Sequence, residues 1–421
     1  MAAVIASAPT NSGGCTPSPL PIPGRTDSFE TRQRLSVLPV QYVNFLREHN
    51  LSDFTAGKPA PRIFMTRNII LCLDGTSNQY SATNTNVIKL YAMLDRTRND
   101  QLSYYQPGIG TIPPPGVWGR LKRWFFTQLD LAIAWLLSQH VTDAYRFLMR
   151  YYQEGDSIFI FGFSRGAYTA RAVAAMLYKV GLLTQGNEEL IPFAWDIFKR
   201  QDNRPLADGF KKTFCRPVQV HFLGLWDTVS SVGWAWAPQH FQFTQNNPGV
   251  DIVRHAVALD ERRAYFVQNL WGNQPPTDIE QVWFPGVHCD VGGGYPENES
   301  GLSAIALKWM VGRAENAGLF INQQMKATVL PQRDVAGADY VAPSAGGPLH
   351  ESLTGLWWLA EFIPKRYKDP AANFATRWMI HAGRHRHLND GAKIHQSVFD
   401  RKRMVPTYRP TNLPSQYQQV P

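Results

Sequence analysis

Short runs of β-branched and aromatic residues alternate along this chain with longer amphipathic patterns. Four runs are bounded by glycine, proline or aspartate and predict buried strands; they cover residues 67–73, 158–161, 218–225 and 281–284. Apolar residues at spacings of three and four predict helices between them, the longest from about Leu129 to Tyr152. This alternation predicts an α/β fold with a mostly parallel central sheet, helices on both faces, and insertions.

One of these strands meets a helix at Gly162-Phe-Ser164-Arg-Gly166. A side chain at either glycine would collide with backbone in so tight a turn, which would hold Ser164 at its tip beside the first amides of the helix. Gly-x-Ser-x-Gly also arises by chance in a long glycine-rich chain. Its place between a strand and a helix therefore carries the prediction that Ser164 is a nucleophile.

Two other strands are followed by a carboxylate and an imidazole, Asp227 and His288. Because the carboxyl ends of parallel strands meet at one edge of a sheet, we expect both side chains to lie near Ser164. The order Ser, Asp, His along the chain is that of the α/β-hydrolases, in which the histidine takes the serine proton and the carboxylate orients the imidazole. A serine hydroxyl needs such a base before it attacks an ester.

The oxyanion formed by that attack needs two fixed hydrogen-bond donors. The amide of Arg165 is one candidate, and the loop at Gly75-Thr76, which follows the first strand, is the other. Nucleophile, base and donors are then all supplied by the chain. No Cys-x-x-Cys or other metal-ligand spacing occurs, so we expect no metal site and no cofactor.

Several motifs together resemble a known family, the catalytic domain of the type VI secretion phospholipase effectors. They occur in the family's order and are Leu73-Asp-Gly-Thr76 with Asn78, Gly162 to Gly166, Leu225-Trp-Asp-Thr-Val229, Leu259-Asp-Glu-Arg-Arg263, Trp283 to Tyr295 and Ile394-His-Gln-Ser-Val398. The resemblance implies an α/β-hydrolase fold, a triad of Ser164, Asp227 and His288, and cleavage of ester bonds, in some members those of phospholipids.

The same motifs allow other interpretations. Asp74-Gly75-Thr76 is similar to the Asp-x-Asp-Gly-Thr motif of haloacid-dehalogenase phosphatases, but Cys72 stands where their nucleophile would be. Asp74 would then shape its loop, while Asp290 either binds a cation or pairs with a loop arginine. Cys289 beside His288 is expected to be a small apolar filler. A binding protein on the same scaffold is disfavoured, because it would not need all three triad residues.

The histidines His255, His381, His385 and His387 lie near arginines in segments that we expect at the surface. The cluster Arg384-His-Arg-His387 has the chemistry to meet phosphate. Trp357 and Trp358, like Trp234 and Trp236, either pack in the core or form a lid or membrane-facing patch.

The formal charge of +9 comes from 42 basic and 33 acidic residues without a block of like charges, which is typical of an ordinary solvated surface. A basic face toward anionic lipid is the alternative. We expect a lipid or small ester as substrate, with peripheral membrane contact and no nucleic acid. The alternative function is a cytoplasmic small-ester hydrolase.

Composition also predicts the domain organisation. We expect a disordered leader over 1–25, a helical extension over 26–64, a catalytic domain over 65–400 with insertions at about 182–216 and 330–380, and a tail over 401–421. No signal peptide or membrane span is apparent, and the four cysteines are far apart. These features favour a cytoplasmic protein, and the resemblance adds export by a dedicated secretion system.

Overall fold

A computed structural model describes residues 66–75, 83–108, 120–201, 204–229, 241–272, 277–355, 357–369 and 375–421. The predicted leader and helical extension, together with Thr76, Trp234 and Trp236, lie outside these residues.

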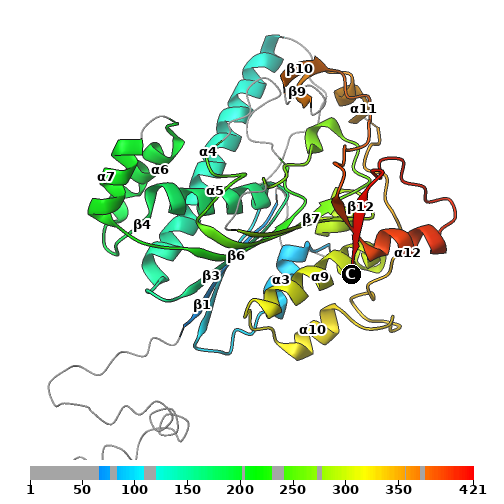
Figure 1. Ribbon diagram of the computed structural model, residues 1–421, viewed down its shortest axis with the longest axis horizontal. Coiled ribbons are helices and arrows are strands. Elements are labelled where there is room, and N and C mark those ends of the chain that lie inside the picture. Colours follow the sequence, from blue (N-terminus) through cyan, green and yellow to red (C-terminus); the bar gives the residue numbers. More distant parts are fainter. Residues whose placement is uncertain are drawn as a thin grey trace, which may run out of the picture. The chain divides into compact units, whose positions relative to one another are not determined.

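The described chain is built on an eight-stranded sheet in the order β12-β11-β8-β7-β6-β3-β1-β2 (Figure 1). Every neighbouring pair of strands is parallel, which confirms the predicted α/β class. The strands are β1 (Asn68–Leu73), β2 (Gln101–Gln106), β3 (Ser157–Phe163), β6 (Val220–Trp226), β7 (Val250–Ala258), β8 (Asp278–Phe284), β11 (Ala392–His395) and β12 (Tyr417–Val420).

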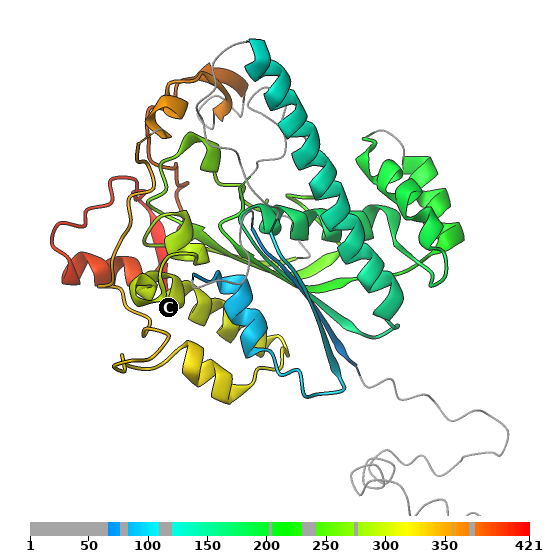
Figure 2. The ribbon, with the colours of Figure 1, turned by 180° about the vertical axis from the view of Figure 1, so that it is seen from behind.

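Alternating side chains of β1 divide the core into two layers. Ile69 and Leu71 pack on one face, whereas Ile70 and Cys72 pack on the other. The first face is covered by α4 (Arg120–Tyr151), α5 (Arg165–Val180) and α6 (Ile191–Lys199). The second face is covered by α3 (Asn86–Met93), α9 (Gly301–Asn316) and α10 (Gln323–Val329). Figure 2 shows the two layers from behind. Helices therefore lie on both faces, as predicted.

The chain leaves the sheet in several places. Between α5 and β6 it forms a small antiparallel pair, β4 (Leu182–Leu183) with β5 (Cys215–Arg216), around α6 and α7 (Arg204–Phe214). Later it forms α11 (Trp357–Glu361), a hairpin of β9 (Lys365–Asp369) and β10 (Ala375–Met379), and α12 (Gln396–Met404). Residues 401–421, expected as a tail, finish α12 and supply the edge strand β12.

The sequence analysis did not predict β7, because Arg254 and His255 interrupt its apolar pattern. It also placed His255 at the surface, which is wrong. His255 is fully buried because β7 lies between β6 and β8. Its ring accepts a hydrogen bond from the Thr228 amide at 3.2 Å and contacts Gln281 Oε1 at 3.2 Å. Burial lowers the pKa of His255 to about 3.

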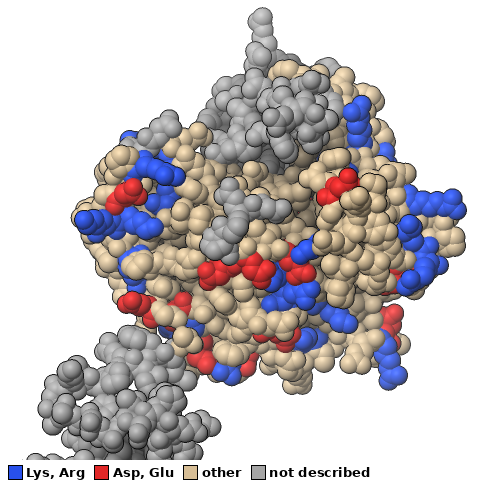
Figure 3. All heavy atoms as spheres, in the orientation of Figure 1, with Lys and Arg blue, Asp and Glu red and all other residues tan. Residues whose placement is uncertain are grey.

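Basic side chains do not form one continuous face in the view of Figure 3. They gather over α7 and over α12, and between these two places acidic and basic side chains are mixed. No described helix combines the length and apolar character that crossing a bilayer requires.

Candidate active site

The strand order places a switch point between β1 and β3, near the β2 edge of the sheet. The chain passes from β1 to β2 on one side and returns to β3 on the other, after which β6, β7 and β8 follow outward. In open parallel sheets the loops on either side of such a point diverge and leave a crevice at the carboxyl ends of the strands. Asp74 follows β1 there, Ser164 follows β3 and Asp227 follows β6.

Ser164 occupies a strained turn between β3 and α5. Its φ is 58° and its ψ is −120°, which a non-glycine residue rarely adopts and which marks functional sites. A Cβ atom at Gly166 would come within 2.2 Å of the carbonyl oxygen of Leu73, and one at Gly162 within 2.5 Å of the carbonyl oxygen of Gly166. Both glycines are therefore required by close backbone approach, as predicted, and the turn lies directly against the end of β1.

His288 and Asp227 meet at this edge. The distance from His288 Nδ1 to Asp227 Oδ2 is 2.5 Å, and both side chains are buried. Asp227 Oδ1 also accepts a hydrogen bond of 2.9 Å from the Ala258 amide. His288 begins the one-turn helix α8 (His288–Gly292).

Two aromatic rings hold the imidazole. Phe163, which precedes Ser164, lies 4.6 Å from it between ring centroids, and Phe266 lies 4.8 Å away in an edge contact. His288 is thus beside the serine turn. In the described part of the chain neither His288 Nε2 nor the Ser164 hydroxyl has a recorded hydrogen-bond partner. Burial lowers the pKa of His288 despite the Asp227 carboxylate, which keeps the ring neutral and able to accept a proton.

Arg386 joins this cluster, and the sequence analysis missed it. Its Nη1 donates to Asp227 Oδ1 at 2.6 Å and its Nη2 donates to Oδ2 at 3.0 Å. Burial would raise the pKa of Asp227, but the charge of Arg386 and the hydrogen bonds from His288 and Arg386 outweigh it and hold that pKa below its usual value. The sequence analysis expected the cluster Arg384-His-Arg-His387 at the surface, but Arg386 is buried.

A second ion pair, between Glu261 and Arg263, contacts the backbone of His288. The Glu261 carboxylate accepts a hydrogen bond of 3.2 Å from the His288 amide and binds Arg263 through two contacts of 2.9 Å. Burial would raise the pKa of Glu261, but the hydrogen bonds and charge of Arg263 lower it to about 2. Glu261 and Arg263 belong to the Leu259-Asp-Glu-Arg-Arg263 motif, so sequence could have suggested them.

The amides predicted to be oxyanion donors differ in their hydrogen bonding. Arg165 is the first residue of α5, so its amide is one of the unsatisfied donors of a helix N-terminus. The Gly75 amide instead donates to Asp74 Oδ1 at 2.7 Å. Thr76, as stated above, lies outside the described residues, and Arg165 therefore remains the donor that the described geometry favours.

Asp74 and Asp290 both bind protein groups. Asp74 Oδ2 accepts hydrogen bonds from the Thr85 and Tyr105 hydroxyls at 2.7 and 3.0 Å. Asp290 accepts one from the Val287 amide at 3.0 Å and contacts His350 Nδ1 at 2.6 Å. Among the described residues no group of three or more His, Cys, Asp or Glu side chains is arranged to hold a metal ion.

Cys289 follows His288 in α8. Burial raises the pKa of its thiol to about 12, so the thiolate needed for nucleophilic attack does not form near neutral pH.

More than half of the chain matches a known protein family. The family described as type VI secretion phospholipase effector Tle1-like, catalytic domain, matches residues 67–313. The chain belongs to this family. The Tle1-like match includes Ser164, Asp227 and His288 but ends well before Arg386.

Relatives of this Tle1-like domain include a yeast protein, the "Uncharacterized protein YEL023C" of Saccharomyces cerevisiae. It is 43% identical over an alignment of 227 residues that covers 50% of this chain and 33% of the yeast protein. The chain therefore matches only a third of that relative's length.

Two solved structures are also similar. One is an uncharacterised protein from Pseudomonas aeruginosa, with 20% identity, a TM-score of 0.38, and coverage of 66% of this chain and 49% of that one. The other is the Tle1 effector bound to the VgrG spike of a type 6 secretion system, with 20% identity, a TM-score of 0.33, and coverage of 60% and 57%.

Proposed function

We propose that this protein is a serine hydrolase that cleaves carboxylic esters through Ser164, His288 and Asp227. The observation that carries the proposal is the 2.5 Å contact between His288 Nδ1 and Asp227 Oδ2, buried beside a serine with a φ of 58°. A carboxylate on Nδ1 leaves Nε2 as the nitrogen that accepts a proton, as serine catalysis requires.

In the proposed reaction His288 Nε2 takes the proton of Ser164 as its Oγ attacks the ester carbonyl carbon. The oxyanion accepts a hydrogen bond from the Arg165 amide at the positive end of α5. The intermediate collapses, the C–O bond to the alcohol breaks, and His288 returns its proton to the leaving alcohol. Water then attacks the acyl-enzyme with His288 again as base, which frees the acid and restores Ser164.

The substrate that we propose is a phospholipid. The family is named for phospholipase effectors, and an apolar surface continues from the site. Phe266, which contacts His288, also contacts Trp357 at 5.7 Å between ring centroids. Next to Trp357, the side chains of Trp358, Leu359 and Phe362 are 40%, 64% and 60% exposed. Such side chains can enter the interface of a bilayer and bring the site to its substrate.

Labelling tests the chemistry. A fluorophosphonate probe should react with the purified protein, and the modified peptide should contain Ser164. Ser164→Ala should abolish labelling, whereas Ser397→Ala, which removes a buried serine far along the chain, should not. Labelling that survives Ser164→Ala would remove Ser164 as nucleophile. An unlabelled and inactive wild-type protein would favour the binding protein considered above.

Vesicles test the substrate. Anionic and zwitterionic phospholipid vesicles should be hydrolysed more efficiently than a soluble short-chain ester, which fills little of an acyl site and forgoes its binding energy. Leu359→Ser and Phe362→Ser should lower only the vesicle rate. Met404→Ser is the matched control, since Met404 is 61% exposed but lies on α12. Turnover of the soluble ester without any vesicle hydrolysis would identify a small-ester hydrolase.

A further inference from the structure

The Arg386 guanidinium donates hydrogen bonds to both oxygens of the Asp227 carboxylate. Besides both Asp227 oxygens, it donates to the carbonyl oxygen of Ala258 at 2.9 Å and to that of Phe266. Only 5% of the residue is exposed. We propose that Arg386 is a positioning residue of the hydrolase reaction, which fixes the plane and the charge of the Asp227 carboxylate. This inference rests on the serine hydrolase function proposed above.

Geometry supports the positioning role. A guanidinium is a rigid fork whose two nitrogens match the two oxygens of a carboxylate. Asp227 is clamped by that fork at 2.6 and 3.0 Å, while the contacts to Ala258 and Phe266 prevent the fork itself from rotating. Asp227 Oδ2 is therefore held where it meets His288 Nδ1. Without the fork, the described donors left to this carboxylate would be the Ala258 amide and His288 Nδ1.

Charge supports the same role. A fully buried carboxylate takes up a proton unless a positive charge or hydrogen bonds stabilise its ionised form. Another arginine close to this region, Arg263, is bound to Glu261. Arg386 is thus the described cation that contacts Asp227, and without it the proton affinity of the Asp227 and His288 pair should rise. A protonated Asp227 would no longer hold the imidazole in its reactive tautomer.

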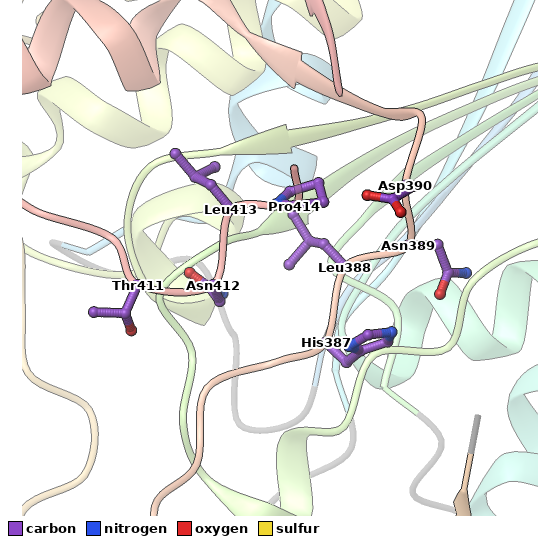
Figure 4. A pocket seen from close by; sticks show the side chains of 8 residues that line it. All are labelled: His387, Leu388, Asn389, Asp390, Thr411, Asn412, Leu413 and Pro414. Carbon is purple, nitrogen blue, oxygen red and sulfur yellow. The ribbon is translucent and has the colours of Figure 1, made fainter. Parts of the chain in front are cut away.

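The segment that delivers Arg386 is fixed by the end of the described chain. Asn412 Nδ2 donates to the carbonyl oxygens of Arg386 and Leu259 at 3.2 and 3.0 Å. Figure 4 shows the segments 387–390 and 411–414 side by side around a shallow pocket of about 460 Å³. Both segments lie beyond residue 313, where the family match ends. The proposed triad is therefore supported by residues outside the matched domain.

The variants Arg386→Met and Arg386→Lys test the proposal, with Arg401→Met as matched control. Arg401 is also 5% exposed, but it donates to the carbonyl oxygens of Ala345 and Gly347 and not to the triad. We would measure melting temperature, fluorophosphonate labelling rate of Ser164, and kcat/KM for a soluble ester across pH.

Arg386→Met should lower kcat/KM and the labelling rate by on the order of 10²-fold, since misplaced catalytic groups cost about that much. It should also move the acidic limb of the pH profile upward by about one pH unit, because a neighbouring positive charge is lost. Arg386→Lys should keep the limb near its wild-type position but remain about tenfold slower, because lysine retains the charge and not the fork. Arg401→Met should change the melting temperature alone.

The proposal is overturned if Arg386→Met labels at the wild-type rate, or if its rate falls with no shift of the acidic limb, as loss of packing alone would produce. If Arg386→Met does not fold, Arg386→Lys decides, and an unchanged rate in that variant refutes the role of the fork. Failure of wild-type protein to label would instead contradict the serine hydrolase function itself.

Discussion

His288 and His350 both contact carboxylates, but the environments of the two rings differ. His288 contacts Asp227 and is buried, and Arg386 neutralises the carboxylate. His350 contacts Asp290 at 2.6 Å and Glu299 at 2.9 Å, and its side chain is 19% exposed. Asp290 lies only two residues after His288 in the sequence.

The difference appears in their protonation. Burial lowers the pKa of His288, and its Nε2 stays available for a proton. Burial would also lower the pKa of His350, but hydrogen bonds to Glu299 and Asp290 outweigh this effect and raise it. Both ring nitrogens of His350 are engaged, so it acts as a clamp between two carboxylates. A carboxylate contact alone therefore does not make a histidine a catalytic base.

The largest expected effect comes from replacing Asp227 by asparagine, compared with the same replacement at Asp290. Asp227→Asn should lower kcat by about 10⁴-fold, because the amide cannot hold the imidazole in the reactive tautomer. Asp290→Asn should lower it far less, because Asp290 contacts His350 and the Val287 amide and not the His288 ring. Steady-state kinetics with a soluble ester would measure both. A near-normal rate for Asp227→Asn would require another carboxylate, and a large loss in Asp290→Asn would identify it.

The next test is the pH dependence of kcat/KM, which should depend on His288 and not on His350. Because the pKa of His288 is lowered, the acidic limb of kcat/KM should have its midpoint below about 6.5, the ordinary value for imidazole. His350→Gln should leave that midpoint in place, since His350 is not the base. If the midpoint moved in His350→Gln, the group that titrates would belong to the His350 cluster, and the assignment of His288 as the base would be contradicted.

Stability should distinguish the same two histidines. The folded-state pKa of His350 is raised, so its ion pairs stabilise the fold fully below the unfolded value of about 6.5 and lose that contribution as pH rises through the folded value. Solvent screens this partly exposed site, so the contribution should be about 1 kcal/mol or less. Urea unfolding of wild type and His350→Gln should differ most at pH values below about 6.5 and converge as pH rises through the folded-state pKa of His350. A difference that grows with pH would refute this account.

The smallest expected effect is that of chelation. The Asp290 and Asp74 carboxylates are bound by protein donors, and the proposed mechanism uses no metal. Prolonged treatment with a chelator should therefore leave the rate on a soluble ester unchanged. Activity that disappeared and returned with calcium would place a cation beside one of these carboxylates.

Sequence could predict much of the scaffold because the relevant signals are local. The apolar runs that became β1, β3, β6 and β8 end at turn residues, and the glycines around Ser164 leave room for backbone atoms that would lie within 2.5 Å of an added Cβ atom. These patterns also placed Ser164, Asp227 and His288 at strand ends. The strand β7 was missed because two polar residues interrupt its apolar run, although buried partners satisfy one of them, His255.

The sequence by itself determined the class of the fold, the strained serine turn, and the three residues proposed to act together. Local propensity and the meeting of parallel strands at one edge suffice for these conclusions. Only the tertiary structure decided which carboxylate meets which histidine and how each is charged. The contact of Arg386 with Asp227 joins residues 159 positions apart, and protonation follows burial and neighbouring charge, neither of which has a periodic signature along the chain.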